Sequence, residues 1–315
     1  MILVAGSANL DFVVRAHHIP APGETVLGRD FQTFPGGKGA NQAVACARAG
    51  GAPTLLLAAM GSDPFAAPIE ASLRNAGVKT SIVRCENEPT GTAFICVSDD
   101  AENAITVAPG ANLQLKAQHL PELVGVSHVL MQLEIPMETV TAYAMQARRQ
   151  GVTVVLNAAP MQMLPTELLE SVDILIVNEG ELTAMSGAAG TVAQRLERTP
   201  VPTIVVTLGH LGCCVRTQGT FLLQPAFAID PVDTTAAGDT FCGSLIAALT
   251  QSTDLQTALA LACAASALAC TRAGAQDSIP QANEVIRFLK QHPGAEPAGL
   301  DVLRAYCGLP LGKKS

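Results

Sequence analysis

Residues 173–178, DILIVN, hold four consecutive apolar side chains between an acid and an amide. A run of this kind, without alternation, is typical of a strand that is buried on both faces of a parallel sheet. Five further runs have the same character: ILVAG (2–6), TLLLAAM (54–60), HVLMQL (128–133), TVVLN (153–157) and TIVVTL (203–208). Helical patterns lie between several of them, at 40–49, 138–150 and 182–185. The chain is therefore predicted to form an α/β structure, a doubly wound and mostly parallel sheet flanked by helices.

Two segments break this rhythm. Residues 12–34 and 92–107 alternate apolar and polar side chains, with turns at PAPGE (20–24) and DDAEN (99–103). This pattern predicts antiparallel strands with one solvated face. The segments are too small to form a core of their own, so we expect one domain over residues 1–315, with a small β lid formed by about 11–35 and 91–108. A one-faced sheet of this size needs a partner, which favours a homodimer formed through the lid.

Composition excludes several classes of protein. The net charge is −8, the basic residues are scattered and tryptophan is absent, all of which argue against a nucleic-acid partner. No apolar run approaches the roughly 20 residues of a membrane span, and the first residues, MILVAGSANLDF, lack the basic region of a signal peptide. Nine cysteines without metal-ligand spacing suit a reduced cytoplasm. We expect a cytoplasmic protein that acts on small molecules.

The chain becomes almost wholly helical after about residue 234, with helices predicted at 238–249, 254–270 and 281–290. The first of these follows DTTAAGD (233–239). A helix N-terminus presents unpaired N–H groups and a positive dipole end. The small residues Ala236, Ala237 and Gly238 would let an anion approach those groups, with Asp239 beside it. Asp239 could be a simple helix cap. Alternatively, an anion hole beside a general base is what phosphoryl transfer to an alcohol requires.

The stretch PGGKGAN (35–41) is not a Walker A motif, because Gly39 and Ala40, and no hydroxyl residue, follow the lysine. Its two leading glycines permit positive φ and a close approach of the backbone. Asn41 then lies near a helix start, where its amide could bind sugar hydroxyls. A glycine hinge followed by a helix cap is the alternative interpretation.

Polar residues also follow the predicted strands, at the sheet edge where α/β proteins bind ligands. Asn9 and Asp11 follow the first strand, and Glu134 follows HVLMQL. Asp11 could accept hydrogen bonds from two neighbouring hydroxyls, although an ordinary loop carboxylate would look the same. Asn178 and Glu181 follow DILIV, either as part of a site or as a helix start whose acids complement the helix dipole.

These motifs resemble the ribokinase-like (PfkB) carbohydrate kinases over essentially the whole chain. DTTAAGD and PGGKGANQAVACARAGG (35–51) are similar to the two family signatures. In addition, GSANLD, PAPGET, TGTAF, LMQLE, VNEGE, TLGHLG and TRAGAQDSIP occur in the family's order. The resemblance implies ATP-dependent phosphorylation of a pentose, with D-ribose as the leading substrate and its 5-hydroxyl as the acceptor. Asp239 would be the general base, and the backbone of residues 236–239 would form the anion hole.

The resemblance also implies ligands for each substrate and cation. For the sugar these are Asn9, Asp11, Gly37, Lys38, Gly39, Asn41, Glu134 and Asp239. For ATP with Mg²⁺ they are Asn178, Glu181, Thr207, Gly209, Gly212, Gly238 and Cys263, where relatives commonly carry Asn or His in place of the cysteine. A monovalent cation, typically K⁺, would be bound by Asp233, Thr235, Ala269, Arg272, Gly274 and Ser278, mostly through main-chain oxygens.

Other members of the same family act on deoxyribose, fructose or nucleosides, and these substrates stay open. A sugar-binding regulator without catalytic activity is a further alternative, although it would be expected to lose the base or the anion hole, and both are intact here. A dinucleotide-dependent oxidoreductase is disfavoured because no G-x-G-x-x-G follows the first strand.

Overall fold

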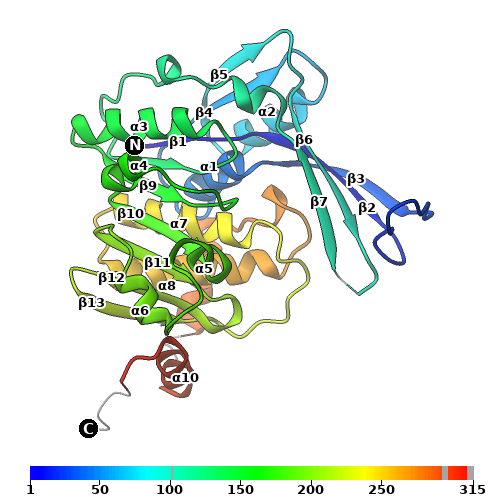
Figure 1. Cartoon of the computed structure of the whole chain (residues 1–315). Helices are drawn as coiled ribbons and strands as arrows, with labels where there is room; N and C mark the ends of the chain where they lie inside the picture. Colours follow the sequence, from blue (N-terminus) through cyan, green and yellow to red (C-terminus); the bar gives the residue numbers. More distant parts are fainter. Residues whose placement is uncertain (101, 293–296, 311–315) are drawn as a thin grey trace.

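The computed structural model describes residues 1–100, 102–292 and 297–310. A nine-stranded sheet runs through the main body in the order β13-β12-β11-β10-β9-β8-β1-β4-β5 (Figure 1). Its strands are β1 (Ile2–Ala5), β4 (Thr54–Gly61), β5 (Lys79–Cys85), β8 (His128–Met131), β9 (Thr153–Asn157), β10 (Ile174–Asn178), β11 (Thr203–Thr207), β12 (Gly212–Thr217) and β13 (Thr220–Pro225). All neighbouring strands from β5 to β11 pair in parallel, which confirms the predicted fold class.

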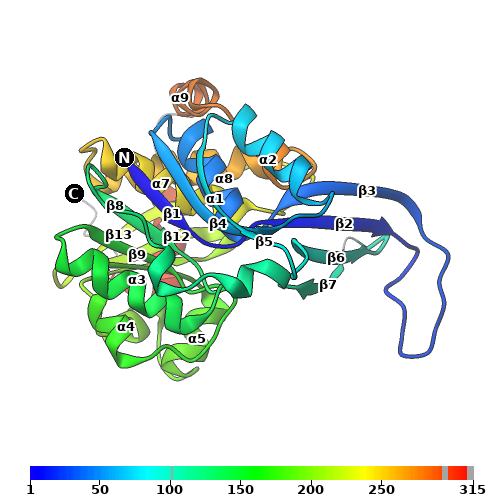
Figure 2. The same ribbon diagram turned by 90° about the horizontal axis from the view of Figure 1, so that it is seen from above.

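Helices cover both faces of this sheet, as the view from above shows (Figure 2). One face carries α1 (Lys38–Arg48), α2 (Ala66–Asn75), α7 (Ala237–Thr250), α8 (Leu255–Cys270) and α9 (Ala282–Gln291). The other carries α3 (Met137–Arg149), α4 (Thr166–Ser171), α5 (Glu179–Ser186), α6 (Val192–Glu197) and α10 (Pro297–Cys307). Alternate residues of each strand face opposite layers. In β1, for example, Ile2 packs into the first core and Leu3 into the second.

The lid is a separate four-stranded sheet in the order β3-β2-β6-β7, and it projects from one side of the main body (Figure 1). Its strands are β2 (Asn9–Arg15), β3 (Arg29–Gly36), β6 (Gly91–Val97) and β7 (Asn103–Ala108). The two outer pairs are antiparallel, as predicted, but β2 and β6 pair in parallel. That part of the prediction was wrong, because the two segments enter the lid from the same edge of the main sheet. Residue 101, in the expected turn DDAEN, lies outside the described residues.

The structure differs from the sequence-based prediction mainly at the edges. The prediction missed the edge strands β5 and β13 and the strand next to β13, β12, which pairs antiparallel with both of its neighbours. It also missed the surface helices α2, α4, α6 and α10, and it made α5 too short. Strand β8 ends at Met131, so Glu134 lies three residues beyond it.

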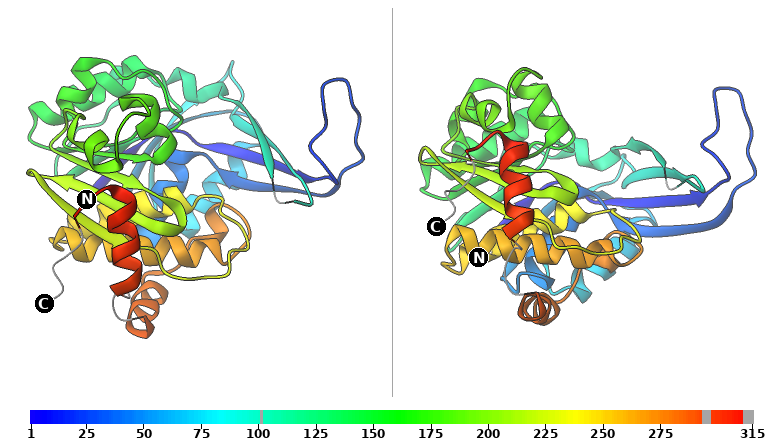
Figure 3. Two further views of the ribbon diagram at one scale, coloured as in Figure 1. Left: turned by 60° about the horizontal axis from the view of Figure 1, so that its bottom comes forward. Right: turned by 90° about the horizontal axis from the view of Figure 1, so that it is seen from below.

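Figure 3 shows α10 crossing the sheet edge near β12 and β13, and a long loop projecting between β2 and β3. Within the described residues, no helix is long and apolar enough to cross a membrane.

Strand order decides where a site can form. β1 and β8 are neighbours in the sheet, but the main sheet continues from β1 to β4 and from β8 to β9, in opposite directions. Loops that leave a parallel sheet in opposite directions open a crevice at the carboxyl ends of the strands. The segment after β1 leads directly into β2 of the lid, and the lid therefore starts at this crevice.

Candidate active site

Asp239 lies in the first turn of α7 and is buried. Its two carboxylate oxygens have different partners, both in α1. Asn41 Nδ2 donates to Oδ2 at 3.0 Å, and Gln42 Nε2 donates to Oδ1 at 2.9 Å. The helix that carries the proposed base is thus joined to the helix that begins in PGGKGAN. Asn41 Oδ1 is buried and has no hydrogen-bond partner in the described part of the chain, so it is available to a ligand hydroxyl.

The start of α7 has the backbone geometry of an anion site. Ala236, the residue before the helix, has φ 58° and ψ 10°, in the left-handed region. A non-glycine residue in that region costs about 1 kcal/mol or more and is often found at functional sites. Gly238 is exposed, and a Cβ placed on it would meet nothing within 4 Å. The backbone at Gly238 therefore borders open space, as an anion hole requires, whereas the Ala237 N–H donates to the Thr234 carbonyl at 3.2 Å.

Asp11 is enclosed by the glycine-rich segment PGGKGAN (35–41), at the end of β3. A Cβ at Gly36 would collide with the Asp11 carboxylate, so only glycine allows β3 to close over this group. The pKa of Asp11 is raised from 3.8 to about 7, chiefly by burial and also by the nearby carboxylates Glu134 and Asp239. The three acids therefore lie close enough to influence one another, although they come from β2, the loop after β8, and α7.

Glu134 is held by the glycine-rich segment and by a serine. Ser7 Oγ donates to Glu134 Oε2 at 2.5 Å, and the Lys38 N–H donates to the same oxygen at 3.1 Å. The Gly39 N–H donates to Ser7 Oγ at 3.3 Å. Gly37 has φ 87°, and a side chain there would collide with the backbone of Ala8 and Asn9. These contacts fix the start of α1 against the segment that follows β1.

Asn9 is oriented by an asparagine that the sequence analysis did not select. Asn112, in the 3₁₀ helix η1 (Gly110–Gln114), donates from Nδ2 to Asn9 Oδ1 at 2.7 Å and accepts the Ala8 N–H at 3.0 Å. Both asparagines are buried. The hydrogen bonds leave the Asn9 Nδ2 group as the end of the amide that is free to turn toward a ligand.

Asn178 and Glu181 form a reciprocal helix cap. The Glu181 N–H donates to Asn178 Oδ1 at 2.8 Å, and the Asn178 N–H donates to Glu181 Oε2 at 2.7 Å. Burial raises the pKa of Glu181, while Lys38 acts to lower it and Asp239 to raise it. The pKa of Lys38 is raised, chiefly by Asp239 and also by Glu134 and Glu181. Lys38 therefore lies among acids from both the α7 side and the α5 side of the crevice.

A cavity of about 520 Å³ adjoins the start of α7. Ala237, Gly238 and Phe241 form its inner end, and Thr207, Gly209 and Gly212 form one wall. Cys263, on α8, lines it as well, with its Sγ 3.9 Å from Cys213 Sγ. Ser266 Oγ donates to the Ala237 carbonyl at 2.9 Å and so joins α8 to the helix start. Apart from His210 and Thr234, the lining beyond these residues is apolar and includes Phe227 and Ile229. The space has the character of a pocket for a planar ring that leads to an anion site.

Asp233 links the turn before α7 to the loop after α8. Its Oδ1 accepts the Thr235 N–H at 2.9 Å and its Oδ2 accepts the Gly274 N–H at 3.0 Å. The Arg272 guanidinium is turned away, to Glu284, with Nη2 2.6 Å from Oε1. Ser278 is fully buried and its Oγ donates to the Ala275 carbonyl at 2.8 Å. The Ala269 carbonyl accepts the Arg272 N–H at 3.1 Å. Most of the residues expected around a cation thus belong to two segments in mutual contact.

Comparison with known proteins agrees with this geometry. The model of the family described as pfkB family carbohydrate kinase matches residues 1–282. The chain belongs to this family of carbohydrate kinases. It is 37% identical to the ribokinase of Haemophilus influenzae over 301 residues, covering 92% of this chain and 98% of the relative. It is 31% identical to a deoxyribokinase of Salmonella typhi over 303 residues, covering 91% and 98%. The structure of Arabidopsis thaliana ribokinase complexed with ribose and ATP aligns with a TM-score of 0.83 at 32% identity, covering 92% and 98%.

For a carbohydrate kinase of this family, the structure adds polar residues that the sequence analysis did not select. These are Ser7, Gln42, Asn112, Gln132 and Asn157, all of them buried. Ser7 lies inside the quoted motif GSANLD, while Gln42 and Gln132 interrupt the apolar runs of α1 and HVLMQL. A polar side chain within an apolar run could have identified Gln42 and Gln132 from the sequence, because a buried polar group must find a hydrogen-bond partner inside the protein.

Proposed function

We propose that this chain transfers the γ-phosphoryl group of ATP to the 5-hydroxyl of D-ribose, giving D-ribose 5-phosphate and ADP. One observation carries the proposal. Asp239 lies at the start of α7, beside Ala237 and Gly238, which line the 520 Å³ cavity. On its other side it lies near Asp11 and accepts a hydrogen bond from Asn41. A general base thus lies between a pocket suited to a nucleotide and one suited to a polyol. The complex of the Arabidopsis relative with ribose and ATP supports these ligands.

On the sugar side, the buried polar groups are suited to hydroxyls. Asp11 as a carboxylate accepts hydrogen bonds from two neighbouring hydroxyls, while the Asn9 Nδ2 group donates and Asn41 Oδ1 accepts. Gly37 and Gly39 pack against the backbone of residues 6–9 and would contact the sugar through their own backbone. Lys38 and Glu134 complete the set, with Glu134 held by Ser7. Each hydroxyl of a pentose would find a partner that is otherwise poorly satisfied inside the crevice.

In the transfer step, the 5-hydroxyl oxygen attacks the γ-phosphorus while the bond to the β-phosphate oxygen breaks. The hydroxyl proton passes to Asp239, and the electron pair of the broken bond leaves with ADP. The backbone N–H groups of residues 236–239 stabilise the charge that spreads over the transferred group, with that of Ala237 shared with the Thr234 carbonyl. Lys38 adds a positive charge nearby. Closure of the lid would exclude water, which otherwise competes as acceptor.

On the nucleotide side, Thr207, Gly209 and Gly212 would contact the nucleotide and Cys263 would lie near the base. Among residues 1–100, 102–292 and 297–310, no three His, Cys, Asp or Glu side chains gather to hold a metal directly. Asn178 and Glu181 nevertheless fit Mg²⁺ held through water, because Glu181 faces the same crevice as Lys38. When bound with ATP, Mg²⁺ would neutralise phosphate charge. The nine free thiols suit a reduced cytoplasm as the site of action.

The test is release of ADP in the presence of ATP and Mg²⁺ with ribose, deoxyribose, fructose, fructose 6-phosphate and nucleosides as acceptors. We expect ribose to be preferred over deoxyribose by about 10–100-fold in kcat/KM, because the missing hydroxyl leaves a buried polar group unpaired. The 31% identical deoxyribokinase makes deoxyribose the second candidate. Faster turnover of deoxyribose would move the substrate and keep the mechanism, whereas sugar binding without ADP release would indicate a regulator.

A monovalent cation is expected to raise activity. The turn before α7 and the loop after α8 offer main-chain, carboxylate and hydroxyl oxygens, which are ligands that suit K⁺. The residues concerned are Asp233, Thr235, Ala269, Arg272, Gly274 and Ser278. When bound, K⁺ would hold the turn before α7 and the loop after α8 together. Replacement of K⁺ by tetramethylammonium at constant ionic strength should lower kcat, and Ser278→Ala should raise the K⁺ concentration needed for half-activation. Equal rates in both salts would contradict the cation site.

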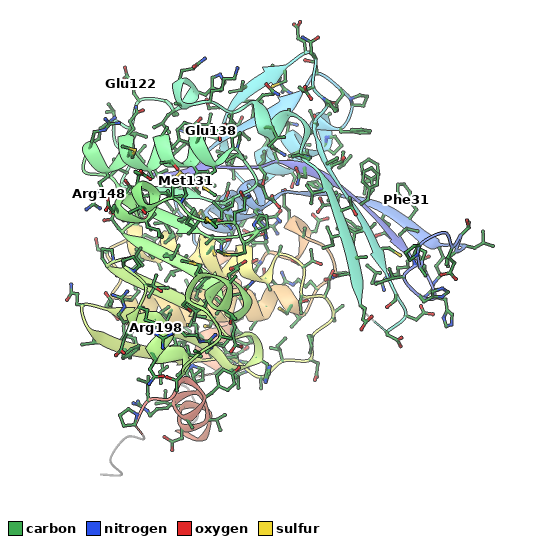
Figure 4. All side chains as sticks on the ribbon, viewed as in Figure 1. Phe31, Glu122, Met131, Glu138, Arg148 and Arg198 are labelled. Carbon is green, nitrogen blue, oxygen red and sulfur yellow. The ribbon has the colours of Figure 1, made fainter. Side chains whose placement is uncertain are left out.

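A homodimer is expected to form through the lid. Phe31 and Phe94 are 64% and 54% exposed and stack on either side of Phe12, which gives one face of the lid sheet an exposed aromatic cluster. Figure 4 labels Phe31 on this part of the lid. Charged substitutions on this face, Phe31→Glu with Phe94→Glu, should convert the protein from dimer to monomer in sedimentation velocity. Met163→Glu, at an exposed methionine away from the lid, is the control. A wild-type protein that sediments as a monomer would refute the expectation.

A further inference from the structure

A row of three buried amides leads from the core to the Asp239 carboxylate. Gln132 Nε2 donates to Gln42 Oε1 at 2.5 Å. Gln42 Nε2 donates both to Asn157 Oδ1 at 3.0 Å and to Asp239 Oδ1 at 2.9 Å. Gln42 and Gln132 are 0% exposed, and Asn157 and Asp239 are 8% and 7% exposed. Gln42 therefore uses both amide hydrogens and its carbonyl within the protein.

The orientation of the row is determined from its far end. Asn157 Nδ2 donates to the Ile176 carbonyl of β10 at 3.2 Å. A main-chain carbonyl can only accept, so the Nδ2 end of Asn157 faces β10 and its Oδ1 faces Gln42. Gln42 must then present its NH₂ group to both Asn157 and Asp239. Gln132 secures the same orientation from the other side, because it donates to Gln42 Oε1. A Cβ at Gly6 would collide with Gln132 Oε1, so the glycine after β1 makes room for this side chain.

Gln42 differs in this respect from its neighbour Asn41. Asn41 also donates to Asp239, but its Oδ1 is unpartnered, so its amide can exchange partners when a sugar binds. Gln42 is sealed from solvent and has no unused group with which to contact a substrate. Its effect on the reaction must therefore pass through Asp239.

We propose that Gln42, oriented by Asn157 and Gln132, is a positioning residue that keeps the Asp239 carboxylate ionised and turns its Oδ2 toward the acceptor hydroxyl. The proposal rests on the proposed function, in which Asp239 is the general base. Four other groups influence or are influenced by the charge of Asp239: Lys38 from α1, Asp11 from the lid, Glu181 from α5 and Cys242 from α7. Lys38 places a positive charge near Asp239, and Asp11 and Glu181 are acids. Gln42 differs from all of them, because it gives the carboxylate a hydrogen bond without adding charge.

The test compares Gln42→Met, Gln132→Met and the double variant by kcat, both KM values and the pH dependence of kcat. Methionine has a similar volume and no donor. For Gln42→Met we expect kcat to fall by about 10–100-fold, as for the loss of a hydrogen bond to a charged group, with both KM values within about threefold. The acid limb of the kcat profile should move to higher pH by about one unit. Gln132→Met should show the same change in weaker form, and should add nothing in the Gln42→Met background.

Thr139→Val is the matched control, since Thr139 is buried and donates to the Leu115 carbonyl away from the site. It should alter the melting temperature only. A purely structural role for Gln42 would lower stability as the control does and leave the acid limb in place, which would overturn the proposal. Additive losses in the double variant would overturn the role of Gln132 as the orienting group. If Gln42→Met does not fold, the shift in Gln132→Met decides the matter. Full activity of Asp239→Asn would instead refute the proposed function, whatever the glutamine variants do.

Discussion

Replacement of Asp239 by asparagine is expected to lower kcat by about 10²–10⁴-fold, the usual contribution of a general base. The change removes the proton acceptor while keeping the shape of the side chain. Asn41 and Gln42 both donate to the carboxylate, so one of these hydrogen bonds must be lost or reversed when an amide NH₂ takes the place of an oxygen. The KM values for ribose and ATP should change much less, because the anion hole is made by backbone amides that the substitution leaves in place.

Asp254→Asn is the matched control for this measurement. Asp254 also stands at a helix start, where its Oδ1 accepts the Thr257 N–H at 3.0 Å, but it belongs to α8 and lies outside the crevice. Its replacement should leave kcat unchanged. Calorimetric titration with ribose would show that Asp239→Asn still binds sugar. A variant that binds sugar and turns over at the wild-type rate would refute the assignment of Asp239 as the base.

The second large effect is expected for Asp11→Asn, and it has two opposite parts. Affinity for ribose should fall by about 100-fold, because a charged acceptor of two hydroxyl hydrogen bonds is replaced by a neutral amide. At the same time, the protein without sugar should become more stable at pH 8. Burial and the nearby acids Glu134 and Asp239 make the ionised form of Asp11 unfavourable in the folded state, which is why the pKa is raised to about 7.

The pH dependence follows from the direction of that shift. The folded protein holds the Asp11 proton more tightly than the unfolded chain, in which the pKa is near 3.8. Between about pH 4 and pH 7 the free energy of unfolding therefore falls as pH rises, and above pH 7 the destabilisation is complete. Its size is on the order of 2–4 kcal/mol. Asp11→Asn removes it, so the melting temperature should rise by several degrees at pH 8 and by little near pH 4.

The same pKa predicts how ribose binding by the wild type depends on pH. Below about pH 7 Asp11 is protonated and loses acceptor capacity, so affinity for ribose should fall as pH falls through this range. Isothermal titration at pH 6 and pH 8, with both proteins, measures the effect. In Asp11→Asn the dependence should be absent. A ribose affinity that is equal at both pH values in the wild type would show that Asp11 is not the acidic ligand of the sugar.

Much of the fold could be predicted because it is encoded in neighbouring residues. Continuous apolar runs such as DILIVN do form the buried parallel strands, and alternation in 12–34 and 92–107 does form the lid. The start of α7 was predictable from the turn residues before Asp239. The strands at one end of the main sheet were harder to predict, since β12 and β13 carry mixed patterns and both of their pairings are antiparallel. The parallel pairing of β2 with β6 also could not be predicted, because it depends on where both segments leave the main sheet.

The site residues also divide into those that the local sequence indicates and those that depend on distant parts of the chain. Those that belong to short motifs, such as Asp11, Asn41 and Asp239, could be selected from the sequence, because a glycine-rich turn or a helix start shows locally which side chains are presented to a ligand. Their partners could not. Gln42 and Asp239 are 197 residues apart in the chain, and Ser7 and Glu134 are 127 apart. The sequence by itself determined the buried parallel strands, the lid segments and the presence of a carboxylate at the start of a helix. Only the tertiary structure decided which buried amide faces that carboxylate, because strand order brings the ends of β1, β8, β9 and the start of α7 to one crevice.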